Sequence, residues 1–242
     1  MDAVNIKNLT KEYKDVVAVD HLALTIAKGE LFSLLGVNGA GKTTAIKMLS
    51  CLTQPTAGDA LIYGKSIRQE PAAVKAMIAV SPQETAVAPG LTVRENLELM
   101  CGVYGFSKAQ RRQKINDTIR QLGLQAVSNK KAGKLSGGWQ RRLSIAMALI
   151  SEPQILFLDE PTLGLDVLAR SELWTLIRAL KESVTIILTT HYMEEAEALS
   201  DRVGIMSQGK LLYCDTVTNI KAQTGAGSLE QAFIHIVKEA EK

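Results

Sequence analysis

The chain has 242 residues, 46% of them apolar and 22% charged, and its net charge is +3. This length is enough for a full hydrophobic core and predicts one large domain or two small ones. The small positive charge gives no reason to expect nucleic acid as a partner. The three scattered cysteines include no C-x-x-C pair and indicate neither a zinc site nor a disulfide framework, so we expect small apolar side chains in a reducing compartment.

The N-terminal stretch MDAVNIKNLT lacks the apolar core of a secretion signal. No apolar run in the sequence approaches the roughly 18 residues that are needed to cross a bilayer. We therefore expect a cytoplasmic protein, and any role at a membrane would require a partner.

Short β-strands are predicted at the start of the chain, and the turn residues Lys28-Gly29-Glu30 separate the last two of them. These strands are expected at residues 4–6, 16–19, 22–26 and 31–35. A helix then runs to about Cys51, and another short strand covers 60–63. This part of the chain is expected to include an antiparallel β subdomain.

Residues 92–127 change to helical character. Thr92 and Glu95 have the spacing of a capping box, and polar, helix-favouring sequence such as KAQRRQKINDTIRQLGL follows. We interpret residues of about 85–140 as a helical insertion rather than a separate core.

From residue 139 to 190, helices and apolar strands alternate. The helices are expected over about 139–151 and 167–182, and the strands over 155–158 and 184–188. Continuous apolar strands are typical of a parallel sheet that is covered on both faces. The predicted fold class is therefore α/β with a mainly parallel sheet, followed by short strands and a last helix from Ser228.

A glycine-rich stretch separates the strand at 31–35 from the helix that follows. It reads Gly36-Val37-Asn38-Gly39-Ala40-Gly41-Lys42-Thr43-Thr44 and fits the P-loop pattern G-x-x-x-x-G-K-[ST] in the required strand-to-helix context. Glycines let backbone N–H groups point at phosphate oxygens, and the helix N-terminus adds partial positive charge. We expect Lys42 to reach the β- and γ-phosphates and the Thr43 hydroxyl to ligate Mg²⁺. This pattern indicates a nucleoside triphosphate site, without separating a kinase from a GTPase, a helicase or a motor.

Two acids, Asp159 and Glu160, end the strand at 155–158. The carboxyl ends of parallel strands are where open α/β sheets bind ligands. Asp159 suits a Mg²⁺ contact through water. The side chain of Glu160 is expected to point the other way, where a carboxylate could act as the general base that orients the attacking water.

Shortly before these acids lies Lys134-Leu135-Ser136-Gly137-Gly138-Trp139-Gln140-Arg141-Arg142-Leu143. Ser136 could cap the helix that follows, and Gly137 and Gly138 would let the helix N-terminus approach an anion. This LSGG run with its basic helix start resembles the signature of ABC ATPases. The motifs follow the order of that family over about residues 3–215.

The resemblance implies roles for further residues. Tyr13 would stack on adenine, and Gln83 would form the Q-loop, which contacts Mg²⁺ and the attacking water. Gly164-Leu165-Asp166 resembles the D-loop, which crosses to a second subunit, and His191 resembles the switch histidine that contacts the γ-phosphate. The expected catalytic residues are Lys42, Gln83, Glu160 and His191. The expected nucleotide contacts come from Tyr13, Gly36 to Thr44, Ser136, Gly137, Gly138 and Asp166, and the expected Mg²⁺ contacts from Thr43, Gln83 and Asp159.

In this family two ATPase domains pair head to tail, and each ATP lies between the P-loop of one and the LSGG run of the other. The resemblance therefore implies a second ABC ATPase subunit, which we expect to be an identical copy. ATP would close the pair and hydrolysis would open it. The sequence departs from the usual LSGGQ at Trp139, which lacks the amide oxygen of glutamine, so we transfer no role to Trp139.

Two stretches resemble the ATPase subunits of two-component exporters, such as those for drugs, antibiotics or sodium, that work with a separate permease. They are residues 88–97 and Ser228-Leu229-Glu230-Gln231-Ala232-Phe233-Ile234. The resemblance implies an ATPase that powers export from the inner face of the cell membrane, with ATP and Mg²⁺ as cofactors. An import ATPase and a soluble ABC ATPase are the alternatives, and the cargo is left open because its contacts would lie in the permease.

On this interpretation the whole chain, 1–242, is one ABC ATPase domain. The core would comprise about 1–84 and 141–215, the helical subdomain about 85–140, and a short tail about 216–242.

Overall fold

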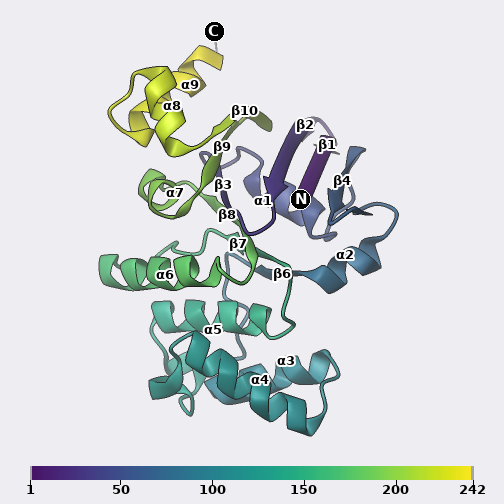
Figure 1. The fold of residues 1–242 in the computed structure, drawn as a ribbon, viewed down its shortest axis with the longest axis vertical. Coiled ribbons are helices and arrows are strands. Elements are labelled where there is room, and N and C mark those ends of the chain that lie inside the picture. The colour runs from purple at the N-terminus through teal and green to yellow at the C-terminus, as the bar shows by residue number, and fades with distance from the viewer. Residues whose placement is uncertain (1, 241–242) are drawn as a thin grey trace.

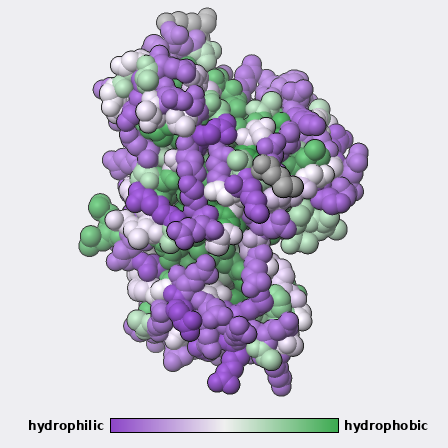
Figure 2. All heavy atoms as spheres, viewed as in Figure 1, coloured by the Kyte–Doolittle hydropathy of each residue, from purple (hydrophilic) through white to green (hydrophobic). Residues whose placement is uncertain are grey.

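The computed structural model describes residues 2–240. Two β-sheets lie in the upper half of the view in Figure 1, a layer of helices lies below them, and two further helices lie near the C-terminus. This arrangement confirms the predicted α/β class. Figure 2 shows that hydrophilic side chains cover most of the face in view, with scattered apolar patches between them.

The smaller sheet is antiparallel, as expected for the start of the chain. Its strands are β1 (Asp2–Tyr13), β2 (Val16–Ala27), β4 (Ala57–Ile62) and β5 (Lys65–Ser66), in the order β2-β1-β4-β5. The prediction of two separate short strands at 16–19 and 22–26 is wrong, because a single strand, β2, covers both. Its pairing with β1 shifts register at several points, and His21 has a left-handed φ of 47°. Such bulges let a strand continue through a stretch whose alternation is broken.

The larger sheet is mainly parallel and has the order β10-β9-β3-β8-β7-β6. Its strands are β3 (Leu31–Leu35), β6 (Ile78–Ser81), β7 (Ile155–Asp159), β8 (Thr185–Thr190), β9 (Arg202–Ser207) and β10 (Lys210–Asp215), and only β10 runs antiparallel to its neighbour. Five carboxyl ends therefore meet at one edge of the sheet, in the order β9, β3, β8, β7, β6.

The predicted helices are present within a few residues, and the short helices at 71–77, 193–199 and 217–224 were not predicted. The helices are α1 (Lys42–Leu49), α2 (Pro71–Met77), α3 (Val93–Val103), α4 (Lys108–Gln121), α5 (Gly137–Leu149), α6 (Val167–Leu180), α7 (Met193–Leu199), α8 (Val217–Thr224) and α9 (Leu229–Ala240). The capping box of α3 is confirmed, because Thr92 Oγ1 accepts from the Glu95 backbone and Glu95 Oε2 accepts from the Thr92 backbone. Among residues 2–240, no helix combines the length and the apolar character that a membrane span requires.

The larger sheet is buried on both faces, which explains its continuous apolar strands. On one face, Phe157 belongs to a cluster with α1 and the smaller sheet. On the other face, Leu156 and Leu158 share a cluster with Leu97 of α3 and Ile119 of α4. The helices that follow residue 85 are thus continuous with the core of the sheet.

Candidate nucleotide-binding site

The loop between β3 and α1 has the backbone that the P-loop pattern requires. Gly41 lies at the N-cap of α1 with a left-handed φ of 100°. A Cβ at this position would lie 2.4 Å from the carbonyl oxygen of Ala18, so only glycine fits. No side chain caps α1, which leaves its first N–H groups available to an anion.

This loop forms one wall of a pocket with a volume of about 740 Å³. Residues 38–44 line it on one side and residues 16–18 of β2 on another, together with Leu163 and Gln208. Gln83, Glu160 and His191 line it as well. The structure thus brings together the four residues predicted to be catalytic, with Lys42 supplied by the loop itself.

Lys42 lies at the centre of the charged groups and is only 4% exposed. Its Nζ donates one hydrogen bond to the carbonyl oxygen of Gly36 at 2.7 Å and one to that of Val37 at 3.1 Å, and it lies 3.7 Å from Glu160 Oε1. Burial lowers the pKa of Lys42, while the carboxylates of Glu160 and Asp159 act in the opposite direction. Phosphate oxygens that enter the pocket would compete with the Gly36 carbonyl for this ammonium group.

Glu160 is the residue directly after β7, and its backbone is fixed by the neighbouring strand. Its N–H lies 3.1 Å from both the carbonyl and the hydroxyl oxygen of Thr189, and its φ is 45°. The side chain is buried, with Oε2 3.2 Å from His191 Nδ1. The two atoms are close without the alignment of a hydrogen bond, so His191 Nδ1 keeps its capacity for another partner.

Thr43 and Asp159 offer oxygen atoms that suit Mg²⁺. Thr43 Oγ1 donates to Asp159 Oδ1 at 3.1 Å, and Thr189 Oγ1 donates to the same oxygen at 2.5 Å. Within residues 2–240, no three or more histidine, cysteine, aspartate or glutamate side chains gather into a metal cage. Mg²⁺ characteristically binds through one or two protein oxygens plus substrate phosphates, so the donors present here fit it.

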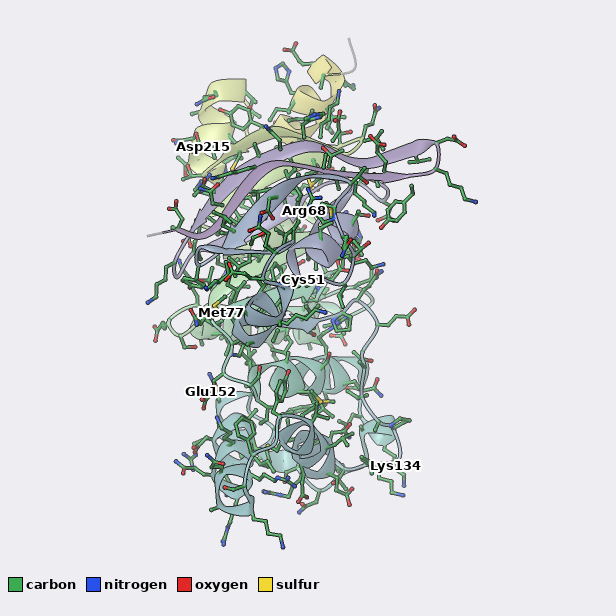
Figure 3. The ribbon with its side chains drawn as sticks, turned by 90° about the vertical axis from the view of Figure 1, so that its right-hand side faces the viewer. Cys51, Arg68, Met77, Lys134, Glu152 and Asp215 are labelled. Carbon is green, nitrogen blue, oxygen red and sulfur yellow. The ribbon has the colours of Figure 1, made fainter. Side chains whose placement is uncertain are left out.

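The signature run forms the start of α5, away from this pocket. In Figure 3, Lys134 lies at the edge of the lower, helical half, whereas Cys51, just after α1, lies in the upper half. The described residues that line the pocket do not include Ser136, Gly137, Gly138 or Asp166. Asp166 instead caps α6 by accepting from the backbone of Ala169 at 2.9 Å. Any anion contact of the signature run would therefore involve a different nucleotide.

The prediction that the Ser136 side chain caps α5 is wrong. Ser136 occupies the N-cap position, but its side chain makes no capping hydrogen bond and is exposed to solvent. Helix packing also favours glycine at position 138, in addition to any role of Gly138 toward an anion. A Cβ at Gly138 would lie 3.1 Å from the Cβ of Ala169, because α5 and α6 approach each other closely there.

Trp139 and Gln140 have separate surroundings. The Trp139 ring is partly buried against the helical core, with the Arg142 guanidinium 4.8 Å from its centroid. The Gln140 side chain turns back to its own chain and donates to the carbonyl oxygens of Ala132 and Leu135. Gln140 therefore holds the loop before α5 and does not replace the glutamine that the usual signature has at position 139.

Tyr13 lies at the end of β1, is 45% exposed and does not line the pocket. Adenine stacking on Tyr13 stays a prediction. The sequence interpretation did not include Val16, Val17, Leu163 or Gln208, which do line the pocket. No motif marks these residues, because segments far apart in the sequence bring them there.

A further buried carboxylate lies on α7, four residues after His191. Glu195 of α7 is fully buried and accepts a hydrogen bond from Trp174 Nε1 of α6 at 3.1 Å. Burial raises the pKa of Glu195, while the nearby Thr190 and Thr162 hydroxyls and the hydrogen bond from Trp174 act in the opposite direction. This carboxyl group ties α7, which begins just after His191, to α6.

Comparison with known proteins identifies the family. Residues 19–163 match the family described as ABC transporter. The chain is 38% identical over 245 residues to the probable multidrug ABC transporter ATP-binding protein YbhF of Escherichia coli, covering 99% of this chain and 42% of YbhF. It is 39% identical over 226 residues to the doxorubicin resistance ATP-binding protein DrrA of Mycobacterium tuberculosis, covering 92% of this chain and 68% of DrrA.

A solved structure agrees with these relatives. The dimeric structure of a post-hydrolysis state of the ATP-binding cassette MJ0796, bound to ADP and Pi, has a TM-score of 0.78 and 29% identity to this chain, covering 88% of this chain and 98% of that one. The chain therefore belongs to the ABC transporter family, and its fold is that of the family's ATP-binding cassettes.

Proposed function

We propose that this chain is the ATP-binding and ATP-hydrolysing subunit of an ABC exporter whose permease is a separate membrane protein. The convergence of Lys42, Gln83, Glu160 and His191 on one pocket beside the P-loop carries this proposal. The similarity over nearly the whole chain to ATP-binding proteins named for multidrug transport and doxorubicin resistance supports export as the direction.

ATP binds with its phosphates against the P-loop. The backbone N–H groups of residues 38–44 and the Lys42 ammonium hold the phosphate oxygens. The nucleoside then extends along β2 toward Val16 and Val17, whose side chains are exposed to the pocket, with Tyr13 beyond them. The apolar side chains and the aromatic ring suit the flat faces of a base.

Hydrolysis uses the groups at the far end of the pocket. The Glu160 carboxylate accepts a proton from the water that attacks the γ-phosphorus, and the bond from that phosphorus to the bridging oxygen of ADP breaks. His191, next to Glu160, donates to a γ-phosphate oxygen, and Gln83 orients the water. Mg²⁺, held by Thr43, Gln83 and Asp159, would supply charge neutralisation for the phosphates.

The working unit is a head-to-tail pair of ATPase subunits, most simply two copies of this chain. The position of Ser136, Gly138 and Asp166 outside the chain's own pocket supports this arrangement. Each signature run then meets the ATP of the other subunit, which gives two equivalent composite sites. The chain works as one ABC ATPase domain at the cytoplasmic face of the membrane, and its helical part, about 85–140, faces the permease.

The test is purification of the tagged protein from detergent-solubilised membranes, with its partners identified by mass spectrometry. We expect a multi-span membrane protein at near-equal stoichiometry, and MgATP hydrolysis by the complex. Recovery only from the soluble fraction, without a membrane protein, would overturn the transporter role. A co-purified solute-binding protein would contradict export, because such a partner delivers substrate for import.

A further inference from the structure

Arg141 is a buried cation that the proposed hydrolysis does not use. It lies on α5, one turn beyond the signature run, and is 4% exposed. Its Nη1 donates to the carbonyl oxygen of Pro82 at 2.6 Å, and its Nη2 donates to the carbonyl oxygen of Gln83 at 2.5 Å. Both acceptors belong to the loop directly after β6, which carries Gln83 to the nucleotide pocket.

These two hydrogen bonds are the main compensation for burying the guanidinium group. Burial lowers the pKa of Arg141, and the carboxylates of Asp159 and Glu195 act against this from a distance. Among residues 2–240, no carboxylate forms an ion pair with Arg141. The planar fork of arginine can donate two nearly parallel hydrogen bonds, which matches two successive backbone carbonyls. The fork therefore fixes the Pro82-Gln83 backbone to α5.

A second contact makes the connection to α5 stiff. Ser144, one turn further along α5, has its hydroxyl 3.0 Å from that of Ser81, the last residue of β6. Helix α5 is continuous from Gly137 to Leu149. Arg141 lies about 7.5 Å along the helix axis from Ser136, at a rise of about 1.5 Å per residue. A displacement of the helix N-terminus therefore moves Arg141 and the loop that it holds.

We propose that Arg141 is a positioning residue that couples the two ATP sites of the dimer. One end of α5 presents Ser136 to the ATP of the partner subunit, and Arg141 on the same helix holds Gln83 of its own pocket. When the partner's ATP engages the start of α5, Arg141 carries that movement to Gln83. This inference rests on the head-to-tail dimer proposed above. Its consequence is positive cooperativity of ATP hydrolysis.

The test compares Arg141→Lys with Arg178→Lys in the full chain. Lysine keeps the positive charge, but it presents a compact point charge without the rigid fork that reaches both carbonyls. Arg178 is the matched control, because its Nε and Nη2 also donate to a backbone carbonyl, that of Ala198, on the exposed side of α6. For each protein, kcat and the Hill coefficient for MgATP are measured. The Kd of ATP without Mg²⁺, which reports on the single chain, and the Tm are measured as well.

We expect wild type and Arg178→Lys to hydrolyse ATP with a Hill coefficient above 1. Arg141→Lys should lower kcat about 10-fold, as for the loss of one hydrogen bond to a charged group, and bring the Hill coefficient to about 1. Its Kd for ATP should stay within about twofold of wild type, because Arg141 touches no part of the pocket except through Gln83.

Two results would overturn the coupling role. One is an unchanged Hill coefficient in Arg141→Lys, with or without a loss of kcat. The other is a wild-type Hill coefficient of 1, since there would then be no coupling to transmit. If Arg141→Lys does not fold, Arg141→Gln replaces it, because its amide can still donate to one carbonyl. A wild-type chain that hydrolyses no ATP, alone or with its permease, would contradict the proposed function and not the role of Arg141.

Discussion

Replacement of the proposed general base by its amide, Glu160→Gln, separates chemistry from binding. Glutamine has the same size and preserves the close contacts of Glu160 with His191 at 3.2 Å and with Lys42 at 3.7 Å. It has no basic carboxylate, so it cannot accept the proton of the attacking water. A general base contributes about 10²–10⁴-fold to a rate. We therefore expect kcat to fall by that factor, which corresponds to about 2.7–5.4 kcal/mol in the activation free energy.

Binding should respond in the opposite direction. Loss of the Glu160 charge removes a repulsion against the γ-phosphate, so ATP should bind at least as tightly, and a stable dimer should appear on a size-exclusion column in MgATP. The rate is followed by phosphate release at saturating ATP. Glu152→Gln is the control, because Glu152 is exposed and forms an ion pair with Lys114 away from the pocket. A Glu160→Gln turnover within about threefold of wild type would refute the role of Glu160 as the base.

Four further predictions concern binding, packing and titration. Lys42→Ala should weaken ATP binding about 10- to 100-fold in a fluorescence titration, as expected for lost hydrogen bonds to a charged group, and should abolish turnover. Trp139→Gln should lower the Tm by about 1–4 °C, because one cation–π contact of about 0.5–1 kcal/mol is lost, and should keep or raise the ATPase rate. Gly138→Ala should lower the Tm by several degrees, since overpacking costs about 1–3 kcal/mol. Glu195→Gln should raise the Tm relative to wild type more at pH 8.5 than at pH 5.5, because the amide cannot ionise.

The sign for Glu195 follows from its environment. Burial raises the pKa of its carboxyl group in the folded chain, so the folded chain binds this proton more tightly than the unfolded chain does. The stability that the group contributes is therefore complete below the unfolded pKa of about 4.3 and is lost as the pH rises through the folded pKa. A Tm difference that does not change with pH would contradict this, and Glu194→Gln, whose side chain is 82% exposed, is the control.

The other three predictions have their own contradicting outcomes. Unchanged turnover in Lys42→Ala would remove the P-loop role of that residue. A large loss of ATPase activity in Trp139→Gln would show that the indole has a role of its own. For Gly138→Ala, the control is Gly137→Ala, whose Cβ would meet Leu165 at an ordinary 3.5 Å. An equal fall in Tm for both glycine variants would refute the packing argument at position 138.

The site could be predicted from the sequence where its chemistry is local. The P-loop is a single run, and the left-handed φ of 100° at Gly41 is a property of that run. Asp159 and Glu160 directly follow an apolar strand, so their place at the sheet edge could be inferred. The fold class followed from the alternation of helices and apolar strands in the same way. These predictions needed only the residues and their immediate neighbours in the chain.

Other features depend on contacts between distant segments. The four-residue strand β6 directly follows the short helix α2, and neither was predicted because neither has a distinct periodicity. The role of Gly138 depends on Ala169 of another helix, and the anchoring of Gln83 depends on Arg141 of α5. From the sequence alone, the signature glycines were expected to serve anion binding. The close approach of α5 and α6 shows that position 138 also leaves little room for a side chain.

The order of the strands explains why these motifs form one site. Along the chain the order is P-loop, Gln83, Glu160, His191. Along the sheet edge the order is P-loop after β3, His191 after β8, Glu160 after β7 and Gln83 after β6. Because β8 lies between β3 and β7, His191 is placed beside Glu160, although the two are far apart in sequence. The residues proposed as proton acceptor and as γ-phosphate contact are therefore neighbours through sheet topology, and the 3.2 Å between Glu160 and His191 is a consequence of that order.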